Sequence, residues 1–322
     1  MRTLSGAVFL FLMNATVAHA QSAQALPIID MHVHVADELD NLRLLEQQQI
    51  VLAILIGTTE AELRRWQDST AITLLPSLLF PCRVHENNRQ GVDCYPDNGA
   101  YYPDPTWRTK PFILPDPAWV RQQLQSGVVK SLGEVTGQYW GLEPSDPALE
   151  PYFALAEEYD VPVGIHLALA PPGEPYRRPT FRARLGNPLL LEDVLVRHPR
   201  LRLWVMHAGH PYQEEMIALL SIYPQVYVDI SAINVTQILP RTAFHDYLEG
   251  LVKAGFAKRV LFGSDFTQQL EETIGAIKSS RFLSEEQKRD ILYHNAARFL
   301  RLNPSTIAEH HRQLQGTRRT RK

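Results

Sequence analysis

Cysteine is scarce in this chain of 322 residues, which contains only Cys82 and Cys94. Structural zinc sites usually place about two to four residues between paired cysteines and need a second pair of ligands. The single, widely spaced pair therefore does not favour a thiolate metal site. In an oxidising compartment the two cysteines instead predict a disulfide that closes one local loop.

An excess of charge of either sign is also missing. The 32 basic and 35 acidic residues give a formal net charge of −3, so the chain has no field that would attract nucleic acid or an anionic membrane surface. Small molecules are the expected substrates. Only the end of the chain, HHRQLQGTRRTRK, is basic, and its composition predicts that residues 304–322 form a flexible, solvated tail.

Long hydrophobic runs are confined to the N-terminus, and nothing after it reaches the roughly 18 apolar residues of a membrane span. The chain starts with Met1 and Arg2, continues with the apolar AVFLFLM and reaches Ala18-His19-Ala20, a form that signal peptidase accepts. We therefore expect residues 1–20 to be a signal peptide. The mature protein is expected to be exported, to the periplasm or beyond, without a membrane span.

Short apolar runs alternate with amphipathic stretches from residue 21 to residue 303, which is typical of parallel strands joined by helices. A doubly wound open sheet would place a Gly-rich phosphate loop after the first strand, where this chain has HVHVADEL. One α/β domain, a (β/α)8 TIM barrel, is therefore expected. The predicted strands are approximately 27–34, 50–56, 72–79, 128–135, 161–167, 201–207, 226–231 and 259–265.

One connection of this barrel is unusually long. Residues 80–115, after the third strand, are rich in Pro, Asn and aromatic residues and show no period, so we expect a loop insertion on the catalytic face. Trp107 in this insertion is a candidate substrate contact, as a member of a lid that excludes water. Packing of the loop on itself is the alternative.

Histidines and acids fall where the predicted strands end, the rim that carries catalysis in TIM barrels. Their nitrogen and oxygen donors suit Zn²⁺, and less often another divalent transition metal. Six candidates exceed the needs of one catalytic ion, so one or two ions are expected. With two, the first would be held by His32, His34 and Asp265 and the second by His166 and His207, with Glu134 between them.

Three further residues are candidates for supporting roles. His210 follows His207 by three residues and is expected either to orient the substrate or only to begin a helix. Arg178, in the excursion after the fifth strand, is a candidate receptor for a carboxylate or phosphate. Asp229, near the end of the seventh strand, is expected either to accept a hydrogen bond from a metal-bound histidine or to be solvated or bonded to the backbone.

Several segments, taken in order, resemble the amidohydrolase superfamily, specifically its family 2 or amidohydrolase-related branch. They are IIDMHVHV, KSLGEVTGQYWGL, LAEEYDVPVGIH, MHAGHPYQEEMIALLSIYPQVYVDIS, RVLFGSDF and EEQKRDILYHNAARFLRL. The resemblance implies a (β/α)8 barrel with one or two metal ions, and hydrolysis or occasionally decarboxylation. Many members bridge two ions with a carboxylated lysine, whereas here the matching position is Glu134, with Lys130 deeper in the barrel. Leu167 and Ala168 depart from the Thr or Gly of many members.

The expected activity is hydrolysis of an ester, lactone, amide or phosphoester of a small molecule. A metal lowers the pKa of water from about 15.7 to about 7, which supplies the nucleophile near neutral pH. Asp265 is expected to be catalytic, taking a proton from the attacking water and passing it to the leaving group. The alternatives are a nonoxidative decarboxylase with a mononuclear site and a non-catalytic periplasmic ligand-binding barrel. Assembly into a homo-oligomer stays open.

Overall fold

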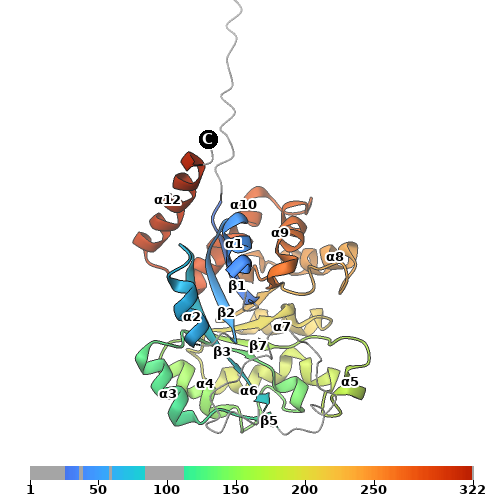
Figure 1. The fold of residues 1–322 in the computed structure, drawn as a ribbon. Helices are drawn as coiled ribbons and strands as arrows, with labels where there is room; N and C mark the ends of the chain where they lie inside the picture. The colour runs from blue at the N-terminus through green and yellow to red at the C-terminus, as the bar shows by residue number, and fades with distance from the viewer. Residues whose placement is uncertain (1–25, 36–38, 58–59, 84–111, 321–322) are drawn as a thin grey trace, which may run out of the picture.

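The computed structural model describes residues 26–35, 39–57, 60–83 and 112–320, and its centre is a curled parallel sheet. The strands occur in the order β10-β9-β8-β7-β6-β3-β2-β1-β11. Helices surround this sheet, which confirms the expected α/β barrel architecture (Figure 1). The strands are β1 (Ile28–His34), β2 (Ile50–Ile56), β3 (Thr73–Phe80), β6 (Ser131–Val135), β7 (Val163–His166), β8 (Leu203–Met206), β9 (Val226–Asp229), β10 (Val260–Leu261) and β11 (Asp265–Phe266).

The predicted eighth strand, 259–265, is divided into β10 and β11. β10 pairs with β9, and β11 pairs with β1, so residues 260–266 join the two edges of the sheet. The backbone N–H of Met31 adds a hydrogen bond to the carbonyl of Phe262 at 3.0 Å. Between the two short strands, a Cβ on Gly263 would lie 3.0 Å from the His32 Cβ, so a glycine allows the first strand to approach closely.

The helices follow the strands in the expected alternation. They are α1 (Leu39–Gln47), α2 (Glu60–Gln67), α3 (Pro117–Ser126), α4 (Glu150–Glu158), α5 (Glu174–Arg177), α6 (Glu192–Arg197), α7 (Gln213–Ile222), α8 (Arg241–Lys253), α9 (Leu270–Lys278), α10 (Glu285–Arg289), α11 (Asn295–Phe299) and α12 (Pro304–Thr320). Local sequence explains their ends. Asp116 caps α3 by accepting a hydrogen bond from the N–H of Ala118, and Ser284 forms a capping box with Gln287 at the start of α10.

Buried side chains form two hydrophobic clusters, a larger and a smaller one. Ile29 and Met31 of β1 belong to the smaller cluster, with Trp204 of β8, whereas Val33 belongs to the larger one. The register of β1 against β2 shifts between Asp30 and Val33. This irregularity reverses the alternation of the strand, so it changes which residues face the interior at the carboxyl end of β1.

The long insertion begins and ends in a two-stranded ribbon. β4 (Cys82–Arg83) pairs antiparallel with β5 (Phe112–Ile113), which places the two ends of the predicted 80–115 insertion side by side. Trp107 and Cys94 lie outside the described residues, and Cys82 is described only by its backbone. The disulfide between the two cysteines therefore stays a prediction, as does the role of Trp107.

The C-terminal segment differs from the flexible, solvated tail expected for residues 304–322. Residues 304–320 form α12, which lies on the outside of the barrel near α2 (Figure 1). His310 is 1% exposed, and its Nδ1 lies 3.0 Å from the Tyr293 hydroxyl. Ile307 and Leu314 pack against the smaller hydrophobic cluster, which contains Tyr293 and Phe299. The basic composition concealed these apolar contacts, which recur at three- and four-residue spacing on one helix face.

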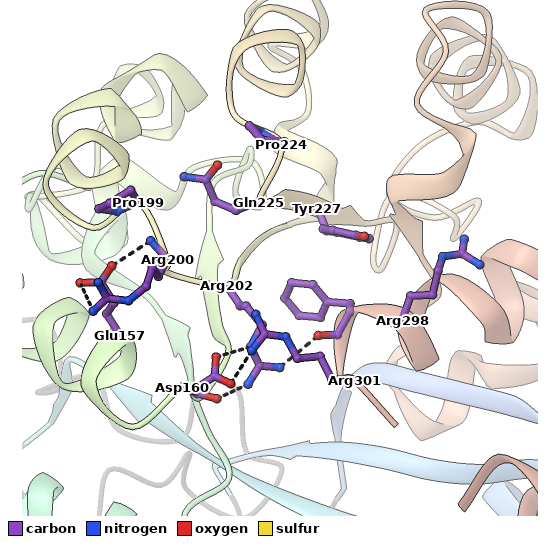
Figure 2. Close-up of a pocket in the computed structure, with 11 residues that line it drawn as sticks. Glu157, Asp160, Pro199, Arg200, Arg202, Pro224, Gln225, Tyr227, Arg298 and Arg301 are labelled. Carbon is purple, nitrogen blue, oxygen red and sulfur yellow. Dashed lines mark hydrogen bonds and ion pairs between the residues drawn. The ribbon is translucent and has the colours of Figure 1, made fainter. Parts of the chain in front are cut away.

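A pocket of about 450 Å³ lies at the amino ends of the strands, opposite the predicted catalytic rim. Asp160 is one of its lining residues, and its carboxylate contacts Arg202 (Nε–Oδ1, 3.1 Å) and Arg301 (Nη1–Oδ2, 2.5 Å) (Figure 2). Arg202 also donates to the carbonyl of Phe299 at 3.0 Å. These contacts connect the C-terminal helical region to the amino ends of β7 and β8. In TIM barrels this end of the strands contributes to stability and not to catalysis. No described helix is long and apolar enough to cross a membrane.

Candidate metal centre

All six residues predicted as metal ligands meet at the carboxyl ends of the strands. Four of their atoms form a first donor group: Nε2 of His32, Nε2 of His34, Oε2 of Glu134 and Oδ1 of Asp265. The distances from the two imidazole nitrogens to the other atoms of the group run from 3.3 Å, between the two imidazoles, to 3.8 Å, between His32 and Glu134. A tetrahedral zinc site with bonds of about 2.0–2.1 Å has ligand atoms about 3.3–3.4 Å apart. The first donor group is therefore close to the size of one zinc site.

A second donor group lies on the other side of Glu134. The Oε1 atom of Glu134 is 2.5 Å from Nδ1 of His166 and 3.5 Å from Nε2 of His207, and the two imidazole nitrogens are 3.1 Å apart. Glu134 thus directs one oxygen to each donor group. This is the arrangement that a carboxylate bridge between two ions requires.

Ser231 fixes the protonation of two of these histidines. Its hydroxyl donates to Oδ1 of Asp229 at 2.5 Å, and it lies 3.0 Å from Nδ1 of His32 and 3.0 Å from Nδ1 of His207. A hydroxyl whose hydrogen is committed to a carboxylate accepts from its other neighbours. Both imidazoles therefore carry hydrogen on Nδ1, which leaves the Nε2 lone pairs directed to the donor groups.

Asp229 fixes the positions of Ser231 and the two histidines through hydrogen bonds. Besides Ser231, it accepts hydrogen bonds from Nε1 of Trp204 at 3.1 Å and from the backbone N–H of His207 at 3.1 Å. Its Oδ2 atom is 3.3 Å from Nδ1 of His32. The carboxylate is fully buried and not solvated. It faces a candidate ligand histidine, as one alternative expected, and it also accepts hydrogen bonds from the backbone, as the other expected.

Strained backbone accompanies the site. Asp265 has a φ of 68°, and the neighbouring His207 and Ala208 have φ values of 57° and 52°. Residues other than glycine adopt this left-handed region at a cost of about 1–3 kcal/mol each. Asp tolerates it better than most residues, whereas the His207-Ala208 pair is held there by contacts that include the bond from the His207 N–H to Asp229.

The electrostatics of the site favour positive charge. Burial alone would raise the pKa of Glu134, but its contacts with His166, His207 and His34 hold it well below its usual range. Burial alone would lower the pKa of His32, but Asp229, with support from Asp265 and Glu134, raises it to about 10. Carboxylates that attract protons onto imidazoles in this way would also attract a divalent cation, which competes with those protons.

The donor set fits a metal in its chemistry as well as in its spacing. All of the ligand atoms are imidazole nitrogens or carboxylate oxygens, which suit zinc. Five of the six side chains are buried, with His34 partly exposed. The Nε2 atom of His166 is buried and has no hydrogen-bond partner among the described residues.

The remaining predicted residues have different positions. Lys130 precedes β6 with an exposed side chain, so Glu134 and not a lysine stands between the donor groups. The ring of His210 packs against Tyr247, with centroids 5.2 Å apart, and in the described part of the chain it joins neither donor group. Arg178 also lies outside both groups, with its Cζ 4.5 Å from the ring centroid of Tyr139.

The sequence interpretation missed two residues that support the ligands. Asp30 is fully buried and accepts hydrogen bonds from the backbone N–H groups of His32, at 3.2 Å, and Ser264, at 3.1 Å. Burial raises its pKa to about 7. Ser231 was also missed, although its place two residues after Asp229 at the end of an apolar strand was a readable signal, because alternate strand residues share a face.

Comparisons with known proteins identify the family and the fold of this chain. A family model described as amidohydrolase matches residues 29–302. A stretch of 136 residues is 24% identical to Protein fluG of Emericella nidulans, and the chain spans only 16% of the length of that relative.

Three solved structures share the fold. A probable 2-pyrone-4,6-dicarboxylic acid hydrolase from Acinetobacter baumannii is 13% identical, with a TM-score of 0.54 over 86% of this chain and 100% of that one. The 5-carboxyvanillate decarboxylase of Sphingomonas paucimobilis is 12% identical, with a TM-score of 0.55 over 87% of this chain and 100% of that one. An amidohydrolase from Burkholderia multivorans with bound zinc is 14% identical, with a TM-score of 0.54 over 86% of this chain and 100% of that one. The family match covers most of the chain, which therefore belongs to the amidohydrolase family of metal-dependent enzymes.

Proposed function

We propose that this protein is a zinc-dependent hydrolase that cleaves an ester, lactone, amide or phosphoester of a small molecule. The observation that carries the proposal is the position of Glu134, whose two oxygens face two separate groups of imidazole and carboxylate donors. Zinc in the Burkholderia multivorans structure and the hydrolase from Acinetobacter baumannii support it.

The two donor groups support a proposed set of ligands. His32, His34 and Asp265 would hold the first ion, His166 and His207 the second, and Glu134 would bridge them. Bound divalent ions supply a Lewis acid for the substrate oxygen and make water nucleophilic near neutral pH.

Asp265 is the residue that would move the proton. Its Oδ1 atom faces His32 at 3.4 Å and His34 at 3.7 Å, and the residue is 7% exposed. A carboxylate has a second oxygen, which would accept the proton of the attacking water and then return it to the leaving group.

A decarboxylase is the second candidate function, because the first donor group alone has nearly the dimensions of one zinc site. The solved decarboxylase with this fold supports that alternative. In such an enzyme a single ion would orient the substrate carboxylate and water would not be the nucleophile. The number of bound ions therefore separates the two candidates.

Elemental analysis of the dialysed protein tests the proposal. We expect about two equivalents of zinc in the native protein and a loss of one or both in the E134Q variant, since an amide is a poor bridge between cations. Hydrolysis of a panel of nitrophenyl esters, lactones and phosphodiesters would follow. One equivalent in the native protein would favour the decarboxylase, and no metal after reloading would contradict both candidates.

We also propose export. Residues 1–20, which lie outside the described residues, carry the charged start, the apolar run and the small residues before a cleavage site. Expression of the full chain, cell fractionation and N-terminal sequencing would test this. Export predicts a periplasmic or secreted product that begins at Gln21, whereas an intact Met1 in the cytoplasmic fraction would contradict it.

A further inference from the structure

One side chain continues the pairing of β6 with β7 beyond the ends of these strands. The last residues in register are Val135 and Ile165, and β7 ends at the next residue, the candidate ligand His166. Nε2 of Gln138 then donates to the carbonyl of Ala168 at 2.8 Å, and Oε1 of Gln138 accepts from the N–H of Ala168 at 3.2 Å. The side-chain amide thus bonds both backbone groups of one residue, as a neighbouring strand would.

The amide of Gln138 is enclosed. The residue is 2% exposed and belongs to the short 3-10 helix Gly137–Trp140, which follows the strand that carries Glu134. Its Nε2 also lies 3.5 Å from the carbonyl of Arg182, and a Cβ on Gly186 would lie 2.7 Å from the same nitrogen. A buried amide is favourable only when its polar atoms are bonded. The backbone of the excursion after β7 therefore fixes this side chain in one place.

A further hydrogen bond extends this row to the next loop. The N–H of Leu169 donates to the carbonyl of His210 at 3.1 Å, in the loop after β8. The loops after β6, β7 and β8 are thus joined at their beginnings. These loops follow the three residues of the second donor group, Glu134, His166 and His207. The first donor group takes three of its four members from β1 and β11, which these bonds do not reach.

We infer that Gln138 is a positioning residue of the second donor group, which holds His166 in place against Glu134 through the backbone of Ala168. The inference rests on the proposed function, in which this group holds the second ion. Nδ1 of His166 lies 2.5 Å from Oε1 of Glu134 and 3.1 Å from Nε2 of His207. Zinc requires ligand nitrogens at about 2.0–2.1 Å, so an imidazole that shifts by a fraction of an ångström binds it more weakly.

Zinc titration of matched variants tests the inference. Q138M keeps the approximate shape of the side chain and removes both hydrogen bonds to Ala168. We expect competition with a chromogenic chelator to show that Q138M weakens one of two bound zinc ions about tenfold to a hundredfold and leaves the other nearly unchanged. The control is Q213M, which makes the same change where Gln213 donates to the carbonyl of Tyr247 at 2.6 Å. It should leave the affinity for both ions unchanged.

A double-mutant cycle shows through which residue Gln138 acts. H166A removes the imidazole, so Q138M should cost little further affinity in the H166A background. A general loosening of the protein would instead weaken zinc by the same factor in both backgrounds. G186A is the second variant, in case Q138M does not fold. Its added methyl group would displace the Gln138 amide without removing it, and it should weaken the same ion.

The outcomes separate this inference from the proposed function. Equal losses in the native and H166A backgrounds, or native affinity for both ions in Q138M and G186A, would overturn the role of Gln138 and leave the two-ion hydrolase intact. A native protein that binds only one ion would contradict the hydrolase. The role of Gln138 would then hold if Q138M and H166A each weaken that ion without adding, and would be wrong if neither does. No zinc in the native protein would overturn both.

Amide exchange of the metal-free protein adds a measurement that does not need zinc. The N–H of Ala168 donates to Gln138, so it should exchange faster with solvent in Q138M than in the native protein and in Q213M. An unchanged exchange rate would mean that the side chain does not hold this backbone, and the inference would be wrong.

Discussion

The substitution Asp229→Asn tests whether the ligand histidines depend on a fixed tautomer. Oδ1 of Asp229 accepts three hydrogen bonds, from the N–H and hydroxyl of Ser231 and the N–H of His207, while Oδ2 faces Trp204 and His32. Asparagine has the same shape, but its amide nitrogen only donates. The amide nitrogen would oppose three donors in the Oδ1 position but only two in the Oδ2 position, where it faces the ring nitrogens of Trp204 and His32. We therefore expect it to take the Oδ2 position.

The size of the effect follows from this geometry. His32 can relieve the conflict by accepting at Nδ1, which moves its proton to Nε2, the atom in the first donor group. A protonated Nε2 cannot bind a metal. Loss of the partner behind a ligand histidine typically costs about tenfold to a hundredfold in metal affinity, equal to about 1.4–2.8 kcal/mol, and we expect a loss of that size for zinc.

Competition with a chromogenic chelator would measure the zinc affinity of the native protein and of D229N at one pH. The matched control is D246N, which makes the same chemical change at an exposed position on α8 and should leave the affinity unchanged. Equal affinities in D229N and the native protein, with native circular dichroism in both, would refute the tautomer argument.

Three other predictions follow from the structure. D265N should reduce turnover to background while retaining part of the zinc, and near-normal turnover with a matched metal content would contradict its role in proton transfer. D160N should lower the free energy of unfolding by about 1 kcal/mol, because it weakens the ion pair with Arg202. Asparagine tolerates the φ of 50° at this position, so backbone strain should not add to the effect. An unchanged urea midpoint would speak against this ion pair. Burial alone would raise the pKa of Glu150, but contacts led by that with His198 lower it from 4.5. Its contribution to stability is therefore present above pH 4.5 and is lost as the pH falls toward the lowered pKa. E150Q should weaken the dependence of urea unfolding on pH between 6 and 3, and an unchanged dependence would count against this ion pair.

The strand ends could be predicted from the sequence, and with them the residues that meet in the two donor groups. The apolar runs before His34, His166 and His207 are short and bounded, so the periodicity identifies both the strands and the residues at their carboxyl ends. The rule that barrels place chemistry at this rim then brought residues distant in the chain together. Glu134 could be preferred to Lys130 on the same grounds.

The supporting contacts could not be predicted in this way. The acceptor role of Asp229 was one of two alternatives, because strand position alone does not show which donors surround a carboxylate. The partners of Arg178 depend on the short helix that carries Tyr139, for which the sequence shows no period. The apolar face of α12 could not be read from composition, because composition counts all residues of a segment together. The helix places its apolar and basic residues on different faces.

The closing segment 260–266 gives the metal centre a part in joining the two ends of the barrel. Ser264 donates to Asp30 across 234 residues of chain, and the first donor group combines His32 with Asp265, so it exists only when the last strand has docked on the first. Joining ends so far apart costs about 5 kcal/mol of chain entropy. An ion that binds only the closed form, at about a thousand times its dissociation constant, returns about 4 kcal/mol. A zinc ion in this site would therefore stabilise the pairing of the first and last strands. Loss of the metal would destabilise that pairing before the rest of the barrel.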